Sequence, residues 1–237
     1  MNPEVLYVDN HVLCVSKPAG MLTQGDITGD FDLLSWCRQY IEVRFNKPER
    51  AFIGLVHRLD RPASGVVLFA RTSKAAARLS RQFRDREVSK KYLAVVEGRM
   101  TGSGVLTHRM RKKGRGVVEA NPTDPEGRLA ELRWRAIASD DRATLVEADL
   151  KTGRKHQIRF QLASAGHPII GDMRYGATDE LDGRNIALHC YHLAVDHPTL
   201  RKRVGWTAPT PASWRILRSA AESFIRLSSV DGPVDAT

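Results

Sequence analysis

The sequence predicts an α+β protein with a mixed, largely antiparallel sheet and flanking helices. Three observations support this class. Short β-prone runs occur in pairs around turn-forming residues, which is typical of antiparallel hairpins. Helical periodicity is confined to a few segments. Few of those segments stand between two strands where they could form a parallel crossover, so a regularly alternating α/β sheet is not expected.

The first seventy residues are expected to form a hairpin, a helix and a buried strand. β-prone runs at 5–8 and 12–16 flank an Asp-Asn pair that suits a tight turn. Apolar residues then recur at helical spacing over 31–45, next to aspartates that can cap the helix. The continuous apolar run 65–70 is short enough for a strand that is buried on both faces.

The next elements are a capped helix, a strand and a basic stretch. Thr72 or Ser73 can cap a helix whose apolar residues share one face. A strand is expected at 92–96. From His108 to Arg115 basic residues are mixed with glycine, which favours a flexible loop that can touch phosphates, although such runs are often merely solvated.

The last hundred residues are expected to supply a second hairpin, two helices and further strands. The β-prone runs 129–137 and 144–150 flank two aspartates, and a helix over 156–165 is expected to end at Gly166. Pro211 is expected to open the last helix. The remaining β-prone pieces are 186–190 and 193–195.

One compact domain over 1–227 is expected, followed by a disordered tail at 228–237, because no repeat or low-complexity linker interrupts the chain. The chain is also strongly basic for its size. Lys and Arg number 37 against 27 Asp and Glu, which gives a net charge of +10 and a pI near 9.8. Such a surface favours a polyanion, because neutralised phosphates release condensed counterions. RNA or DNA is therefore the expected partner.

A membrane location is not expected. The chain has no signal peptide, lipidation signal or apolar stretch long enough to span a bilayer, and a cytoplasmic protein is predicted. The three cysteines Cys14, Cys37 and Cys190 are widely spaced and lack metal-ligand spacing, so buried reduced thiols are expected.

The densest polar stretch is His57-Arg58-Leu59-Asp60-Arg61-Pro62-Ala63-Ser64-Gly65, directly before an apolar strand. One carboxylate among several nitrogen bases, in a turn held by Pro and Gly, suits an ionised nucleophile. The same pattern also fits a structural salt-bridge network, which is the commoner arrangement when the charge pattern alone is considered.

A second cluster runs from Lys151 to Arg159, where a strand is expected to pass through a glycine turn into a helix. Positive side chains and backbone donors at a helix start can hold a phosphate. Arg159 lies one turn beyond His156 and shares its face. A solvated basic helix end is the alternative.

These residues resemble the RluA-type pseudouridine synthase family. The first cluster matches its catalytic signature His-Arg-Leu-Asp-Arg followed by Ser-Gly. Lys90-Lys91-Tyr92 matches its Lys-x-Tyr segment, and residues 153–159 with 166–176 match its third signature. Residues 5–20 and 188–198 resemble its opening and closing motifs. The resemblance covers about four-fifths of the chain in order, and chance agreement of five co-linear motifs is very improbable.

The resemblance implies an isomerase of uridine in structured RNA, with the family's catalytic fold and a central active-site cleft. It makes Asp60 the catalytic carboxylate, Tyr92 the aromatic residue against the base, and Arg159 the cation paired with Asp60. The target base must leave its stack. Whether the carboxylate attacks the sugar or the base stays open.

The resemblance also implies partners and an absence of cofactors. Ribosomal or transfer RNA is the expected substrate, no redox cofactor, nucleotide or metal is needed, and a monomer without an obligate protein partner is expected. His189-x-x-His192 lacks the further ligands of a metal site. The expected RNA-binding residues are Arg58, Arg61, Arg109, Arg111, Lys112, Lys113, Arg154, Lys155 and His156.

Two positions depart from the family pattern: Ala63 stands where Thr is usual, and Gln161 where His is frequent. Neither carries the nucleophile, so they put in doubt packing or substrate choice. No small RNA-binding module is expected in front of the first motif. A non-catalytic RNA-binding protein is the main rival, and a glycosidase is disfavoured because no second acid accompanies Asp60.

Overall fold

The computed structural model describes residues 2–46, 48–183, 185–215 and 217–228. They form two compact units. Unit 1 contains the described residues up to Ser89, Cys190–Pro209 and Ser228, and unit 2 contains the described residues of Lys90–His189 and Thr210–Leu227. The predicted boundary of a catalytic domain at 227 stays a prediction. Of the predicted tail, Ser228 is the last residue of a helix, and 229–237 lie outside the described residues.

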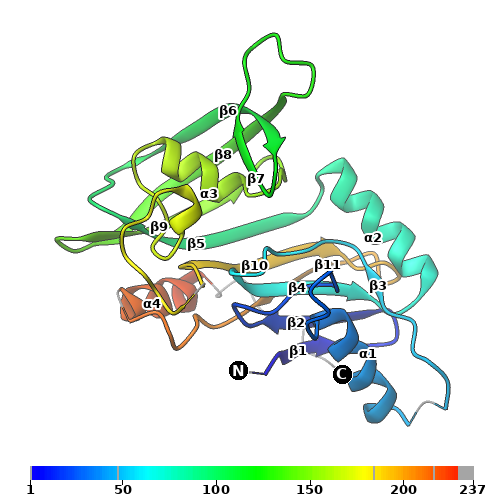
Figure 1. The fold of residues 1–237 in the computed structure, drawn as a ribbon. Coiled ribbons are helices and arrows are strands. Elements are labelled where there is room, and N and C mark those ends of the chain that lie inside the picture. Colours follow the sequence, from blue (N-terminus) through cyan, green and yellow to red (C-terminus); the bar gives the residue numbers. More distant parts are fainter. Residues whose placement is uncertain (1, 47, 184, 216, 229–237) are drawn as a thin grey trace. The chain divides into compact units, whose positions relative to one another are not determined.

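Unit 1 is built on a sheet whose strands run in the order β1-β2-β4-β10, with β11 paired to β10 and β3 to β4 (Figure 1). The predicted first hairpin is confirmed, since β1 and β2 pair antiparallel. All seven residues of β4 are buried, as the apolar run predicts. The strands are β1 (Glu4–Val8), β2 (Val12–Lys17), β3 (Gly54–Leu55), β4 (Ser64–Ala70), β10 (Leu188–Asp196) and β11 (Arg203–Thr207).

Two amphipathic helices belong to unit 1. In α1 (Leu33–Arg44) Asp32 is the N-cap and accepts a hydrogen bond from the Ser35 amide. In α2 (Ser73–Asp85) Thr72 caps in the same way through the Ala75 amide. Both caps were among the predicted candidates. The helices bury one apolar face and turn the other to solvent, which for α2 is strongly basic.

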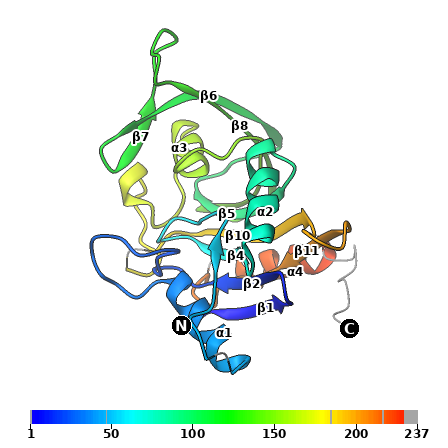
Figure 2. The same cartoon turned by 90° about the vertical axis from the view of Figure 1, so that its right-hand side faces the viewer.

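Unit 2 contains a second set of strands in the order β5-β9-β8-β6-β7, in which neighbours pair antiparallel. Figure 2 shows β6, β7 and β8 curving around α3. The strands are β5 (Ser89–Glu97), β6 (Ser103–Lys113), β7 (Gly116–Glu119), β8 (Arg128–Ser139) and β9 (Ala143–Leu150). The helices are α3 (Gln157–Ser164), the short 3-10 helix η1 (Met173–Tyr175) and α4 (Arg218–Ser228).

Three predicted elements need correction. The stretch from His108 to Arg115 is not a flexible loop, because it forms the end of β6 and its turn into β7, with Met110 buried. Its alternation of side chains was hidden by the number of charges. The last helix begins at Arg218 and not at Pro211, although the buried Trp214 still anchors the segment before it. The two β-prone pieces after 186 form one strand, β10.

The predicted α+β class and largely antiparallel strand pairing are thus confirmed. Within the described residues, no helix is long and apolar enough to cross a membrane.

Candidate functional site

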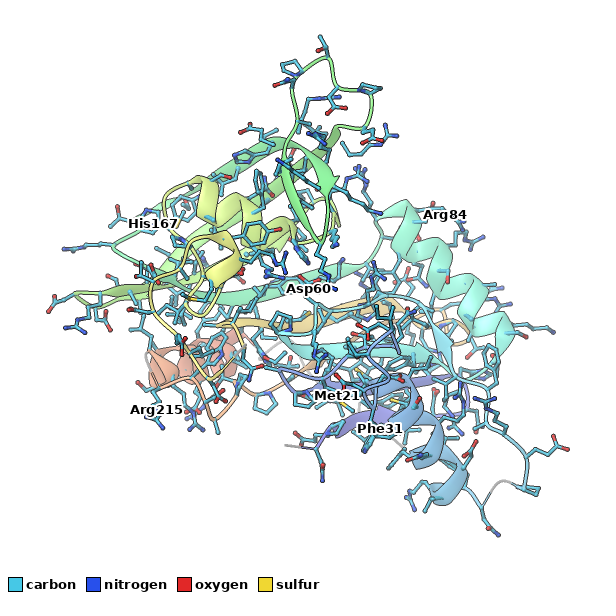
Figure 3. The ribbon with its side chains drawn as sticks, in the orientation of Figure 1. Met21, Phe31, Asp60, Arg84, His167 and Arg215 are labelled. Carbon is cyan, nitrogen blue, oxygen red and sulfur yellow. The ribbon has the colours of Figure 1, made fainter. Side chains whose placement is uncertain are left out.

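The first group of candidate residues lies in unit 1, in the turn that leads into β4. Asp60 is half-buried and is labelled in Figure 3. Its carbonyl oxygen accepts a hydrogen bond from the Ala63 amide at 3.1 Å, which closes the turn. Arg58 and Arg61 on either side are exposed. Arg61 is also ion-paired with Asp30 at 2.7 Å and donates from Nε to the Gly20 carbonyl at 3.0 Å. The carboxylate therefore lies on a tight turn between two exposed cations, one of which already has an acidic partner.

A buried lysine holds this turn through hydrogen bonds to backbone carbonyl groups. Lys17, at the end of β2, is 0% exposed, and its Nζ donates hydrogen bonds to the carbonyl oxygens of Met21, Pro18 and Arg61 at 2.8, 3.0 and 3.2 Å. Burial lowers the pKa of Lys17 to about 7; the Asp60 carboxylate opposes this shift and the Arg61 cation adds to it. One side chain thus joins the turn after β2 to the turn that carries Asp60.

Two further contacts hold the residues that precede Asp60. The Thr23 hydroxyl donates to the Leu59 carbonyl at 2.9 Å and accepts from the Leu59 amide at 3.2 Å, so it pairs both backbone groups of that residue. His57 accepts from the Leu68 amide through Nε2 at 2.9 Å and stacks on Phe83 at 4.6 Å. In the signature, His57 and Leu59 therefore have structural contacts that position Asp60.

The glycine that ends the signature is required by a close approach of two strands. Gly65 has φ +119°, a conformation that other residues rarely adopt. A Cβ added there would lie 2.2 Å from the carbonyl oxygen of Cys190 in β10. No side chain fits without displacing backbone, which explains why glycine follows Ser64 at the start of β4.

The second group lies in unit 2 and is centred on Arg159 of α3. The Arg159 guanidinium donates from Nε and from one terminal nitrogen, Nη2, to the two carboxylate oxygens of Asp172, at 2.7 and 2.8 Å. Arg159 is 5% exposed and Asp172 2%, so this is a buried two-point ion pair. Burial without such a partner would cost far more, because a buried charge must be compensated.

Tyr175 connects Arg159 to the entrance of α3 and to β7. The Arg159 guanidinium lies over its ring at 5.2 Å. Its hydroxyl accepts a hydrogen bond from the Val117 amide at 3.1 Å and lies 2.8 Å from Nδ1 of His156. Burial raises the pKa of Tyr175, so the phenol keeps its proton and can donate it to that ring nitrogen.

The start of α3 is held in an uncommon way. His156, the N-cap residue, has φ +51° and makes no side-chain cap hydrogen bond. Gln157 instead fixes the segment before the helix: its side-chain oxygen accepts from the Arg154 amide at 3.0 Å and from the Thr152 hydroxyl at 2.8 Å. A left-handed non-glycine residue costs energy, and such conformations gather at functional sites.

Tyr92 is the remaining predicted catalytic residue. It lies on β5 opposite Ala148 of β9, with 6% of its surface exposed. Tyr92 and Arg159 thus belong to unit 2 and Asp60 to unit 1. Their joint action, the pairing of Arg159 with Asp60, and the central cleft stay predictions.

Some of the predicted RNA-binding residues form hydrogen bonds or ion pairs within the protein, and others are exposed. Arg109 donates to the carbonyls of Asp124 and Gly127 at 3.0 Å, and Arg111 pairs with the Asp124 carboxylate at 3.1 Å. Both brace the loop after β7. Lys112 and Lys113 are exposed at the hairpin end. Arg154 is exposed but donates to the Leu129 carbonyl, and Lys155 is half-buried.

The two departures from the family pattern are packing positions. Gln161 is fully buried, and its amide nitrogen contacts the carbonyls of Leu106 and Ala130, at 2.8 and 3.2 Å, and the His108 ring. It ties α3 to β6 and β8. Ala63 is buried in the turn after Asp60.

Sequence reasoning missed the residues that build the two groups. Lys17, Asp172 and Tyr175 all stand inside the quoted motifs, but no role followed from their residue types. Only a fold that returns η1 to α3 brings Asp172 and Tyr175 to Arg159.

The histidines of the His189-x-x-His192 pair have contacts other than with a metal. His189 packs edge-on against Trp214, and His192 Nδ1 lies 3.2 Å from the Thr207 hydroxyl. Across the described ranges, no group of three or more His, Cys, Asp or Glu side chains is arranged to hold a metal ion.

Comparison with known proteins identifies the family. A family model described as RNA pseudouridylate synthase matches residues 11–164. The Bacillus subtilis protein named uncharacterized RNA pseudouridine synthase YhcT is 34% identical over 221 residues, which cover 90% of this chain and 70% of that protein. Ribosomal large subunit pseudouridine synthase C of Vibrio vulnificus is 33% identical, over 86% of this chain and 65% of its own length. The chain thus spans about two thirds of the length of these relatives.

The fold agrees with this assignment. The solved structure of human RNA Pseudouridylate Synthase Domain Containing 4 superposes with a TM-score of 0.75 at 21% identity, covering 94% of this chain and 93% of that one. The chain belongs to the RNA pseudouridylate synthase family, whose members are isomerases that act on RNA. The predicted family, reaction class and fold are confirmed.

Proposed function

We propose that this protein isomerises specific uridines of large-subunit ribosomal RNA to pseudouridine, with Asp60 as the catalytic carboxylate. The observation that carries the proposal is the signature His57-Arg58-Leu59-Asp60-Arg61 followed by Ser64-Gly65 within the matched family segment. It is folded as a braced turn with Asp60 between two exposed arginines. The choice of ribosomal over transfer RNA follows the name of the Vibrio vulnificus relative.

The reaction needs a negatively charged group at the reacting centre, because positive charge develops on the ribose when its bond to uracil breaks. The bond between ribose C1′ and uracil N1 breaks, the uracil turns, C5 joins C1′, and the proton lost from C5 is matched by one gained at N1. Asp60 can add to the sugar or the base, or stabilise charge on the ribose. Tyr92 stacks on the uracil and relays a proton, and Arg159 keeps Asp60 ionised when water is excluded. These roles follow the family resemblance.

RNA binding is assigned to exposed cations, which hold flanking phosphates while the target base leaves its stack. A cytoplasmic location and a monomeric state accompany this proposal as predictions.

Asp60→Asn tests the proposal. Product formation on large-subunit ribosomal RNA should fall by roughly a thousandfold or more, while RNA affinity stays nearly unchanged because the phosphate contacts remain. Glu4→Gln, an equivalent change at an exposed carboxylate of unit 1, should leave both quantities unaltered. Pseudouridines are mapped by chemical adduct and primer extension in RNA from cells with and without the gene. Normal turnover by Asp60→Asn would refute the proposal, and wild-type protein that binds RNA without modifying it would favour the non-catalytic rival.

A further inference from the structure

Unit 1 contains a pocket of about 620 Å³ to which the family resemblance assigns no role, although Asp196, His197 and Pro198 of the closing motif line part of it. One wall is the C-terminal half of α2, with Arg78, Arg81 and Gln82. The other wall is the turn between β10 and β11, with His197, Thr199 and Arg201. None of the residues that the sequence predicts to bind RNA lines this pocket.

Side-chain hydrogen bonds fix the two walls to each other. The Gln82 amide donates to the Asp196 carbonyl and accepts from the Asp196 amide, each at 2.8 Å, so it continues the end of β10 as a strand would. Arg78 donates to the Pro198 carbonyl. Gln82 is buried, so water does not compete for its two hydrogen bonds to the turn.

The turn itself is rigid because a buried histidine caps it. Nδ1 of His197 accepts from the amides of Thr199 and Leu200, at 3.3 and 3.1 Å. An accepting Nδ1 leaves the proton on Nε2, which donates to the Asp9 carboxylate at 2.9 Å. The pocket is thus preformed before any ligand arrives, and its cations are presented from fixed backbone.

The pocket stands in the most basic part of unit 1. Residues 74–87 and 196–203 together hold eight Lys and Arg against three Asp and Glu, a net charge of +5 out of the chain's +10. Lys74, Arg78 and Arg81 lie on one face of α2 at helical spacing, and Arg84, labelled in Figure 3, extends the cluster in the last turn. Among the residues that the structure describes, the side chains of Arg81 and Arg201 form no hydrogen bond or ion pair.

We propose that this pocket binds the phosphodiester backbone of the substrate RNA at a distance in sequence from the reacting uridine, with Arg81 and Arg201 as the main contacts. The inference rests on the proposed function, since it takes RNA as the substrate. Exposed guanidinium groups on a fixed frame suit phosphate oxygens. An acidic protein segment is disfavoured, because the pocket's described lining contains no aromatic or large apolar anchor.

Two residues that line the pocket, Asp196 and Glu87, carry carboxylates that affect how a phosphate can bind. Asp196 lies 3.4 Å from Arg203, so that its charge is offset. Glu87 also lines the pocket, and its carboxylate repels an incoming phosphate. Neutralising it should therefore improve RNA binding, which is opposite to the effect of removing an arginine.

The test measures binding of a labelled duplex RNA of G·C pairs only, which offers no uridine to the catalytic residues. Arg81→Gln with Arg201→Gln should raise Kd roughly tenfold and lower the slope of log affinity against log salt by roughly 1.5 to 2. The control is Arg44→Gln with Arg226→Gln, which removes two exposed arginines outside the pocket and should change Kd by less than about twofold. Glu87→Gln should lower Kd.

The outcomes separate this inference from the proposed function. If pocket and control variants weaken binding equally, the site is only diffuse positive charge and the inference is overturned. If Glu87→Gln weakens binding, phosphate does not enter the pocket. Turnover at saturating ribosomal RNA is measured in parallel: it should be unchanged in the pocket variants, with KM raised. A wild-type protein without turnover, whose affinity still depends on Arg81 and Arg201, would refute the proposed function and leave the pocket as an RNA site.

Discussion

The two units hold their candidate residues by different means. In unit 1, Asp60 lies on a turn braced by contacts to backbone groups: Lys17 binds three carbonyl oxygens, and Thr23 pairs both backbone groups of Leu59. In unit 2, Arg159 is held by contacts between side chains, through Asp172 and Tyr175. Backbone bracing fixes the path of the chain and leaves the carboxylate accessible. A side-chain network fixes the charge and keeps the guanidinium buried.

This contrast predicts where the largest loss of stability should occur. Asp172→Ala removes the carboxylate that accepts two hydrogen bonds from the Arg159 guanidinium in a buried site, which typically costs about 3 to 5 kcal/mol. The matched control is Glu222→Gln, which breaks the exposed Arg218–Glu222 pair of the same unit and should cost less than about 0.5 kcal/mol. Both values are measured by urea unfolding. Similar losses for the two variants would mean that the buried network contributes no more than a surface ion pair.

Lys17→Met should have the next largest effect. It leaves the carbonyls of Pro18 and Met21 without the lysine donor and removes one of two donors to the Arg61 carbonyl, which keeps the Gly20 amide at 2.8 Å. We expect a loss of about 2 to 4 kcal/mol at neutral pH. Turnover should fall as well, because the Asp60 turn loses its brace. Lys74→Met, at an exposed position of the same unit, should cost less than about 0.5 kcal/mol. A stable but inactive Lys17→Met protein would show that the lysine positions the turn without supporting the fold.

The difference in stability between wild type and Lys17→Met should depend on pH. The pKa of Lys17 is about 7 in the folded chain, below its ordinary value of 10.5, so between these values the unfolded chain binds more protons. The free energy of unfolding contributed by this group therefore rises with pH across that window, and it is constant below it. The difference in stability between wild type and Lys17→Met should grow between pH 7 and 10. A constant difference would show that the three carbonyls keep the ammonium charged.

Elements with strong local patterns were predicted well, and those set by distant contacts were not. The first hairpin, β4 and the caps of α1 and α2 follow from turn chemistry and periodicity over short stretches. The end of β6 was mistaken for a loop because its charges mask the alternation that buries Met110. Asp60, Tyr92 and Arg159 were selected by resemblance. No local signal marks Lys17 as the brace of the Asp60 turn, since its partners include a residue 44 positions away.

The smallest expected effect concerns the strained entrance to α3. His156→Gly would remove a left-handed non-glycine conformation, which stabilises the chain, and would also remove the contact with Tyr175, which destabilises it. The two effects are each about 1 kcal/mol, so the net change in unfolding free energy should lie within about 1 kcal/mol of zero. Activity should fall several-fold, because Tyr175, whose ring lies under the Arg159 guanidinium, loses one of the contacts of its hydroxyl. The matched control is Arg86→Gly. Arg86 also has a left-handed conformation, with φ +64° at the end of α2, so glycine there should raise the free energy of unfolding without altering turnover. If both variants gain stability and keep full activity, the strain at His156 has no part in the reaction.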